Sequence, residues 1–432
     1  MNYKEAMALL HASSGKGGIL GLERIEKLLD LLGHPERELQ YIHVTGTNGK
    51  GSVSYLTASI LRESGYRVGL FTSPFLDHYE EQIRVDGCEI DQASLCQLTG
   101  QMEQALKSME DWPTEFELTV VLAFLYFRKM HCDLVVLEVG MGGAGDATNV
   151  IPAPEAAVLV SIDLDHTAFL GNTIEEIAEV KSGIIKPGCT VISAPQTREA
   201  ETVIRSRCQE VGADLIQMNA VQYDTDLCIR KRDWEGQVIS YGKWQDLKLG
   251  LLGDYQARNA CVVLELVETL RNKGWKLPDA AVRRALSNAS WQGRFEVVSW
   301  KPRIVIDGAH NPHGVRALAE NLRGYLKPGE RCIALVGILA DKDYRTMLEL
   351  TLPYVSQYIT ITPPNPRALS AEDCAKTIGE LGGLARAAGS VEEGARLALD
   401  AAGEEDMICA FGSLYSVASV RQSLIWTRKR IL

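Results

Sequence analysis

The chain has 432 residues, which is more than one compact core usually holds and therefore suits two domains. Its composition, 46% hydrophobic and 23% charged, is typical of a soluble globular protein. The formal net charge of −11 argues against a general binder of nucleic acids or anionic membranes, because such binders need a basic surface. Anionic small molecules remain compatible with this charge, since one local cluster of cations can hold them.

The ten cysteines are scattered from Cys88 to Cys409, and no two lie within three residues of each other. This spacing provides neither a CxxC metal or redox motif nor a disulfide framework. No stretch approaches about 18 uninterrupted apolar residues, and the first residues lack the apolar core of a signal peptide. We therefore expect a cytoplasmic protein with reduced thiols and no membrane span.

In the first half of the chain, short apolar runs alternate with helical patterns. The runs are apolar on both faces, as in buried parallel strands, and the alternation predicts a wound α/β sheet. The predicted strands are 41–45, 67–72, 133–139, 156–161 and 190–194, and the predicted helices are 51–64, 91–109, 117–131 and 173–184.

The second half begins with short alternating runs over 225–250, which predict an antiparallel extension. Two helices are expected next, over 256–273 and 278–288, and the α/β rhythm then restarts with strands at 304–307, 332–336, 357–361 and 407–411. The expected architecture is therefore α/β: a wound-sheet domain with a phosphate-binding loop over 1–296, followed by a smaller Rossmann-like α/β domain over 297–432.

The sharpest local signal is the Gly-rich run from Thr45 to Ser52, TGTNGKGS, directly after the strand at 41–45. A glycine-rich turn between a strand and a helix lets successive N–H groups converge on phosphate oxygens. Lys50 would neutralise phosphate charge, and Ser52 could contact a phosphate or the Mg²⁺ sphere. The spacing departs from GxxxxGK[ST], and a Gly-rich surface turn is the alternative. The predicted nucleotide-binding residues are Thr47, Asn48, Gly49, Lys50, Gly51 and Ser52.

This run resembles the TGTNGKGS loop of the Mur ligase superfamily, and of its folylpolyglutamate synthase/dihydrofolate synthase branch in particular. Matching blocks recur from about residue 20 to about residue 420. The resemblance implies a monomeric ligase that uses ATP and Mg²⁺ to activate a carboxylate as an acyl phosphate and to join it to an amino acid.

A nucleotide needs Mg²⁺, and three oxygen or nitrogen donors follow strands that end at one sheet edge. By resemblance, Ser73, Glu138 and His166 hold the metal. A histidine ligand is unusual for so hard a cation, and Ser73 before Pro74 could instead be a turn residue. Glu138 ends an apolar strand, where an unpaired carboxylate would be costly to bury.

Lys181 lies in a segment similar to one of the family in which the lysine is carbamylated by CO₂. The resemblance implies a carbamylated Lys181 here, and, with Lys50 and His166, a place among the catalytic residues. Carbamylation needs a neutral amine, which burial would favour. Without the resemblance, Lys181 would be interpreted as a solvated helix residue.

Further blocks resemble the parts of the family that place ATP between two domains. The resemblance implies that Asn259 contacts adenine, that Arg294 reaches the phosphates, and that Asp307 and His310 lie near the ribose and the phosphates. A guanidinium suits this role because it bridges phosphate oxygens well. Asn311 could simply cap the helix that Pro312 starts, which is the alternative for this block.

For the second substrate, Phe116, Glu117 and Asp146 match segments beside the family's pterin pocket. The run 141–149 departs from the family pattern, since Ala144 and Gly145 stand where many members have Arg and Leu. One cationic contact is therefore absent, which affects the expected pteroate specificity but not the ligase chemistry.

We thus expect an ATP-dependent ligase that adds L-glutamate to a reduced folate, and that could also use dihydropteroate. Three alternatives remain: a cell-wall ligase of the same superfamily, a P-loop kinase that leaves the phosphate on its product, and a nucleotide-gated binding protein without turnover. The sequence shows no Ser-His-Asp or Cys-His signature, in agreement with a reaction that needs no protein nucleophile.

Overall fold

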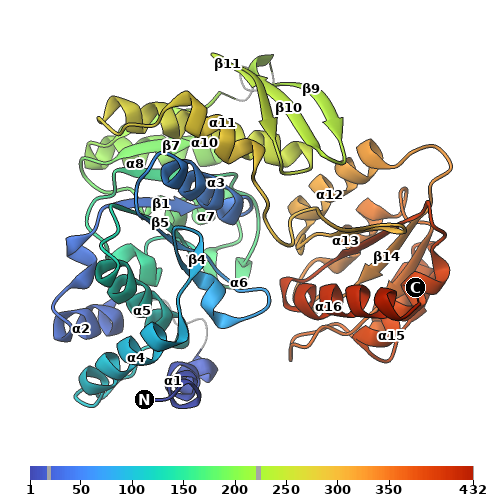
Figure 1. Ribbon diagram of the computed structural model, residues 1–432, viewed down its shortest axis with the longest axis horizontal. Helices are drawn as coiled ribbons and strands as arrows, with labels where there is room; N and C mark the ends of the chain where they lie inside the picture. The colour runs from blue at the N-terminus through green and yellow to red at the C-terminus, as the bar shows by residue number, and fades with distance from the viewer. Residues whose placement is uncertain (17–20, 220–224, 432) are drawn as a thin grey trace. The chain divides into compact units, whose positions relative to one another are not determined.

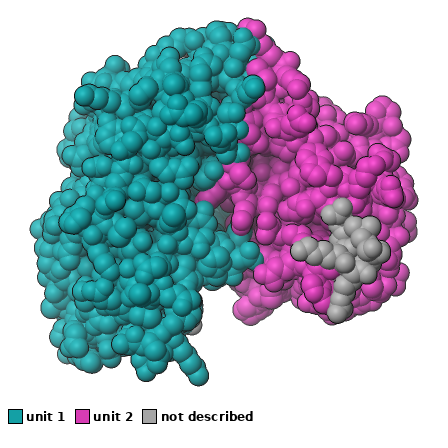
Figure 2. Space-filling view, viewed as in Figure 1, with its two compact units in different colours: residues 1–228, 239–248, 258–289 teal, residues 229–238, 249–257, 290–432 magenta. Residues whose placement is uncertain are grey.

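The protein is described by a computed structural model, which covers residues 1–16, 21–219 and 225–431 (Figure 1). The chain divides into two compact units, each made of three segments (Figure 2). Unit 1 comprises 1–228, 239–248 and 258–289, and unit 2 comprises 229–238, 249–257 and 290–432.

Unit 1 is built on an eight-stranded sheet whose central strands are parallel. Both faces of these strands are buried, which explains their continuous apolar runs. At one end of the sheet, β3 runs antiparallel to both of its neighbours, β2 and β4. The strand order is β4 (Cys88–Glu89), β3 (Ile83–Val85), β2 (Val68–Phe71), β5 (Leu134–Glu138), β1 (Tyr41–Thr45), β6 (Ala156–Leu159), β7 (Thr190–Ser193) and β8 (Asp214–Gln217).

The helices of unit 1 start at recognisable caps. Helix α5 begins with a capping box in which the Thr114 hydroxyl accepts from the Glu117 N–H and the Glu117 carboxylate accepts from the Thr114 N–H. Helix α3 begins differently, because its N-cap Gly49 has φ +95° and no capping side chain. The helices, with four 3₁₀ turns, are α1 (Tyr3–Leu10), η1 (His11–Lys16), α2 (Glu23–Leu31), η2 (Pro35–Glu38), α3 (Lys50–Glu63), η3 (Tyr79–Gln82), α4 (Gln92–Leu106), α5 (Glu115–Lys129), η4 (Ala147–Val150), α6 (Thr167–Leu170), α7 (Ile174–Ser182), α8 (Arg198–Val211) and α11 (Asp279–Ser287).

After β8 in the chain, the strands β9 (Cys228–Asp233), β10 (Gly236–Tyr241) and β11 (Trp244–Leu249) form a separate three-stranded sheet. Helix α10 (Asp254–Asn272) follows. Its first four residues belong to unit 2 and the others to unit 1.

Unit 2 contains a six-stranded sheet, parallel except for β12. Asn311 caps α12, and its side chain accepts from the Gly314 N–H at 2.8 Å, as in the alternative interpretation of this residue. The strand order is β12 (Glu296–Trp300), β13 (Arg303–Ile306), β17 (Met407–Phe411), β14 (Cys332–Val336), β15 (Gln357–Thr360) and β16 (Ala385–Ala387), and the helices are α12 (Pro312–Tyr325), α13 (Tyr344–Thr351), α14 (Ala371–Glu380), α15 (Val391–Ala401) and α16 (Leu414–Ile431).

The expected α/β class, with a wound sheet followed by a smaller α/β part, is confirmed. The strands and helices predicted by residue range occur with ends shifted by at most three residues, whereas the helices α1, α2, α6 and α8 and the strands β3, β4, β8, β12 and β16 were not predicted. None of the helices in the described residues combines the length and apolar character that a membrane crossing requires.

Candidate active site

The Gly-rich loop follows β1, at the centre of the unit 1 sheet, and leads into α3. The Thr47 N–H donates to the Ser161 carbonyl at 2.8 Å, and the Thr47 hydroxyl donates to the Asp163 carbonyl at 2.9 Å. A methyl group at Gly46 would lie 2.3 Å from Val160 Cγ2, so only glycine fits against the end of β6 there. The loop is therefore fixed by the segment after β6, and α3 directs an uncapped N-terminus at it, as in an anion site.

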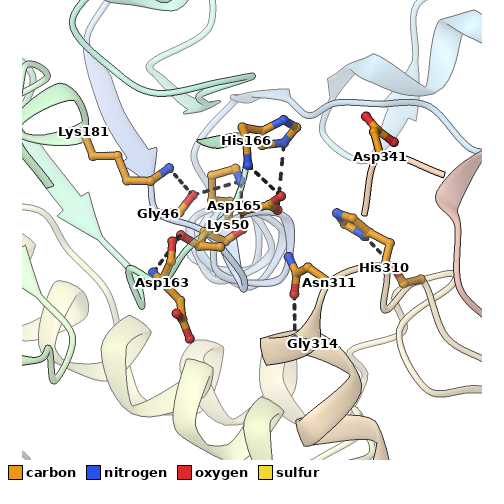
Figure 3. Close-up of polar contacts among 12 residues, drawn as sticks. Gly46, Lys50, Asp163, Asp165, His166, Lys181, His310, Asn311, Gly314 and Asp341 are labelled. Atoms are coloured by element: carbon orange, nitrogen blue, oxygen red, sulfur yellow. Dashed lines mark hydrogen bonds and ion pairs between the residues drawn. The ribbon is translucent and has the colours of Figure 1, made fainter. Parts of the chain in front are cut away.

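Two lysines converge on this loop (Figure 3). Lys50 Nζ donates to the Gly46 carbonyl at 3.1 Å and to the Thr47 carbonyl at 3.3 Å, and Lys181 Nζ donates to the Gly46 carbonyl at 2.9 Å. Lys181 is 4% exposed, so it is not the solvated residue of the alternative interpretation. Burial, together with the nearby Lys50 ammonium, lowers the pKa of Lys181 to about 7.

The three predicted metal ligands follow β2, β5 and β6, strands that are parallel to one another. The structure brings two of them together, since the Ser73 N–H donates to Glu138 Oε2 at 3.3 Å. His166 lies beside Asp165, with its Nε2 3.9 Å from Asp165 Oδ2, and adopts a left-handed φ of +51° at the start of α6. No group of three or more His, Cys, Asp and Glu side chains in the described part of the chain could alone hold a metal ion.

These residues nevertheless fit a Mg²⁺ ion that arrives with a nucleotide. Glu138 supplies a hard carboxylate that is only 4% exposed, at the same sheet edge as the Gly-rich loop. Mg²⁺ usually takes one or two protein carboxylates and completes its shell with phosphates and water, so an all-protein cage is not required.

Asn259 lies directly against the Gly-rich loop. A methyl group at Gly49 would be 2.7 Å from Asn259 Oδ1, and both residues belong to unit 1. Asn259 lies in α10, so helices α3 and α10 together bring the predicted adenine contact to the predicted phosphate contacts.

Of the predicted substrate residues, Asp146 lies in the loop that follows β5 and Phe116 packs against it. Asp146 is 3% exposed, and its carboxylate accepts from the Met141 N–H at 2.9 Å, the Thr148 N–H at 3.0 Å and the Thr148 hydroxyl at 2.5 Å. The Phe116 ring packs against Gly140, where a methyl group would be 2.5 Å from the ring. Ala144 and Gly145 lie in this loop, and Ala144 is exposed.

Sequence reasoning missed His43, which supports this loop. The buried His43 of β1 lies with Nε2 2.8 Å from the Thr148 hydroxyl, and burial lowers the His43 pKa to about 3. Arg24 of α2 donates twice to the Glu117 carboxylate, at 3.1 Å each, so Glu117 is paired with a guanidinium. An apolar strand with one histidine was the available signal for His43.

In unit 2, Arg294 precedes β12, and Asp307 and His310 follow β13. The Gly308 N–H donates to the Gly293 carbonyl at 2.7 Å, which joins the two segments. Asp307 is 5% exposed, and burial raises its pKa while the Arg294 charge lowers it. His310 Nδ1 lies 2.8 Å from the Gly308 carbonyl, so its Nδ1 carries the proton and its Nε2 is an acceptor when the ring is neutral.

Comparison with known proteins places this site in a family. Residues 44–267 match the Mur ligase middle domain, and residues 293–414 match the glutamate ligase domain of Mur ligases. The folylpolyglutamate synthase of Lacticaseibacillus casei is 36% identical over 439 residues, which cover 98% of this chain and 99% of that protein. The chain belongs to the folylpolyglutamate synthase/dihydrofolate synthase family of Mur ligases.

Other members of the family agree along the whole chain. The dihydrofolate synthase/folylpolyglutamate synthase of Bacillus subtilis is 33% identical, covering 98% of this chain and 99% of the relative. The structure of Escherichia coli FolC in complex with DHPP and ADP has a TM-score of 0.87 at 29% identity and covers 99% of both chains. The family expected from the Gly-rich loop is thus confirmed.

Proposed function

We propose that this protein is an ATP-dependent ligase that adds L-glutamate to a folate through an acyl-phosphate intermediate. The observation that carries the proposal is the Gly-rich loop, which is held against Asp163, carries Lys50 and is contacted by Lys181 of α7. The chain matches the first relative over 98% of its length. A loop of N–H groups and ammonium groups is suited to the phosphates of a nucleotide.

In the proposed reaction, ATP binds to the residues from Thr47 to Ser52, with Asn259 at the adenine. The substrate carboxylate attacks the γ-phosphorus, giving an acyl phosphate and ADP. Lys50 and Arg294 offset the charge that develops on the transferred phosphoryl group. The glutamate amine then attacks the acyl carbon and phosphate leaves. Asp307 and His310 are assigned to the ribose and the phosphates.

We assign Ser73, Glu138 and His166 to Mg²⁺, which would supply positive charge beside the phosphates. Since Glu138 is the buried carboxylate of this set, Glu138→Gln should raise the Mg²⁺ concentration that half-saturates activity about tenfold or more. Titration of activity with Mg²⁺ tests this assignment, and an unchanged half-saturation would contradict it.

We further propose that Lys181 is carbamylated, which would turn this cation into an anion beside the loop. Its burial and lowered pKa support the proposal, because CO₂ reacts with the neutral amine. Phe116, Glu117 and Asp146 are assigned to the folate side of the site, where dihydropteroate could also bind.

Ten free cysteines, most of them buried, suit a reducing cytoplasm, and we propose a cytoplasmic monomer with functional domains 1–296 and 297–432. Light scattering from the purified protein tests the monomer, and a dimer mass would contradict it.

Phosphate release tests the proposed ligase directly. ATP, L-glutamate and tetrahydrofolate are supplied together and then with each one omitted in turn. The ligase releases phosphate only in the complete mixture. Phosphate on a stable product formed without glutamate would instead indicate a kinase, and the absence of turnover would indicate a binding protein.

A further inference from the structure

The backbone of unit 2 has an unusual conformation at the residue after Arg294. Phe295 has φ +50°, in the left-handed region, and Gly293 has φ +65°. Bulky side chains rarely adopt this region, and such a residue persists only where its surroundings determine it. The chain therefore reverses locally around Arg294, and neighbouring groups must hold the reversal.

The Phe295 ring anchors one side of this turn. It is 1% exposed, stacks on Trp234 with ring centroids 6.0 Å apart, and lies 5.3 Å from the Tyr325 ring. All three residues belong to unit 2. Burial of a whole aromatic ring contributes about 2 kcal/mol or more, which is enough to offset the cost of the left-handed conformation.

Asp307 anchors the other side. Its Oδ2 accepts from the Phe295 N–H at 2.9 Å and from the Tyr255 hydroxyl at 3.0 Å, and its Oδ1 accepts from the Ala309 N–H at 2.8 Å. A carboxylate oxygen has two lone pairs, so Oδ2 is saturated and Oδ1 keeps one acceptor position. Tyr255 thus fixes which Asp307 oxygen faces the turn and which can accept another donor.

Arg294 itself lies over the same segment. A methyl group at Gly308 would be 2.8 Å from Arg294 Nη1, so the guanidinium packs on this glycine. Gly293, before Arg294, is hydrogen-bonded to Gly308, and Phe295, after it, is hydrogen-bonded to Asp307. These bonds fix the backbone position from which the Arg294 side chain extends.

We propose that Tyr255 and Phe295 are positioning residues for the nucleotide. Tyr255, through Asp307, and Phe295, through its buried ring, hold the turn that presents Arg294 to the phosphates and keep Asp307 Oδ1 open to a ribose hydroxyl. The inference rests on the proposed function, in which Arg294 and Asp307 serve the nucleotide. It adds residues that contact no substrate themselves.

The test compares Tyr255→Phe with a matched control, Tyr358→Phe. Tyr358, on strand β15, is a buried tyrosine of the same unit. Its hydroxyl lies 2.9 Å from the Thr351 hydroxyl. Each change removes a buried hydroxyl group together with its hydrogen bond to Asp307 or to Thr351. We expect Tyr255→Phe to raise the KM for ATP and the Kd for ADP about tenfold, since the lost bond is to a charged group. The KM values for glutamate and folate should stay within about twofold, whereas kcat at saturating ATP should also fall, because Arg294 is assigned to the phosphoryl group during its transfer.

Tyr358→Phe should lower the melting temperature but leave the ADP affinity unchanged. Phe295→Gly tests the ring apart from the backbone conformation, because glycine adopts φ +50° without strain and lacks the ring. We expect this variant to weaken ADP binding as well. If Tyr255→Phe binds ADP as tightly as the parent, the inference is wrong even though the parent is an active ligase. If the parent binds ADP but adds no glutamate, the proposed function fails, and the ADP comparison still decides the role of Tyr255.

Discussion

At the scale of single residues, burial decides the protonation state of the groups beside the phosphate loop. Lys181 has a pKa lowered to about 7, so a large fraction of its amine is neutral at physiological pH, whereas an ordinary lysine is almost fully charged. The neutral amine is the form that reacts with CO₂. Lys181 donates a hydrogen bond to the Gly46 carbonyl, so a change in its charge acts directly on the Gly-rich loop, which a surface lysine would not do.

We therefore expect one carbamate to form at Lys181 near pH 7.5. Protein incubated with ¹³C-bicarbonate should show a carbamate resonance that is missing from Lys181→Met, and that variant should lose at least about 100-fold in kcat. The same resonance in the Lys181→Met spectrum, or parent activity in that variant, would contradict this assignment.

His43 provides a second test through stability. Its folded pKa, about 3, lies below the unfolded value of 6.5, so the unfolded chain binds more protons between these values. The contribution of neutral His43 to stability is complete above about pH 6.5 and is lost as the pH falls toward 3. Between pH 7 and pH 5 the parent should lose about 2 kcal/mol more unfolding free energy than His43→Gln, which still has a donor for Thr148.

Urea denaturation of both proteins at the two pH values measures this difference. Parallel losses of unfolding free energy in the two proteins would show that His43 is charged in the folded state or does not control this pH range.

At the scale of elements, the start of α3 combines a glycine conformation with a close contact. Gly49 has φ +95°, and a methyl group there would lie 2.7 Å from Asn259. Gly65, after the end of the same helix, has φ +94° with nothing within 4 Å. Gly49→Ala and Gly65→Ala should therefore both be destabilised by about 1 kcal/mol, but only Gly49→Ala should lose ADP affinity, by about tenfold or more.

Calorimetric titration with ADP separates the two effects. Equal ADP affinities for Gly49→Ala and Gly65→Ala would mean that the nucleotide does not bind at this end of α3.

The pair of Arg24 and Glu117 joins α2 to the first turn of α5. Glu117→Gln keeps the capping box but removes the carboxylate charge that the Arg24 guanidinium contacts, so we expect a loss of about 3 kcal/mol in unfolding free energy. Arg24→Met should also destabilise. The double variant should lose less than the sum of the two losses, by about 1 kcal/mol or more. Additive losses in this double-mutant cycle would show that the pair is not coupled.

Comparison of the predicted with the observed elements shows which parts of the fold could be predicted from the sequence. The strands β1, β14 and β17 were predicted with their observed ends, because short runs that are apolar on both faces and bounded by polar residues have few other interpretations. The Gly-rich loop could be predicted because its function needs glycines and a lysine at fixed spacing. Strands such as β8 and β16, which carry polar residues, were missed because half-exposed edge strands lack that apolar signal.

The predicted site residues were less completely determined. Ser73 and Glu138 are neighbours, as expected from strands that end at one edge, but strand order alone could not predict the left-handed conformation of His166 at the start of α6. Contacts such as that of Tyr255 with Asp307 join residues 52 positions apart through side chains alone. No periodicity or spacing in the sequence encodes a contact of this kind.

At the scale of the whole molecule, two α/β units carry complementary parts of one proposed reaction. Unit 1 holds the phosphate loop, the lysines and the buried Glu138, and unit 2 holds Arg294, Asp307 and His310. Neither set alone contains both the phosphate loop and the guanidinium assigned to the phosphates. The activity of the intact chain is therefore the property to measure.

The most direct measurement is the mass of the folate product. The intact protein is incubated with ATP, Mg²⁺ and L-glutamate, in one reaction with tetrahydrofolate and in another with dihydropteroate. The account predicts a tetrahydrofolate product heavier by one glutamyl unit, with one ADP formed for each glutamate added; the same gain on dihydropteroate would extend the activity to dihydrofolate synthesis. If ATP is consumed and no glutamyl product forms on either substrate, the proposed ligase is wrong.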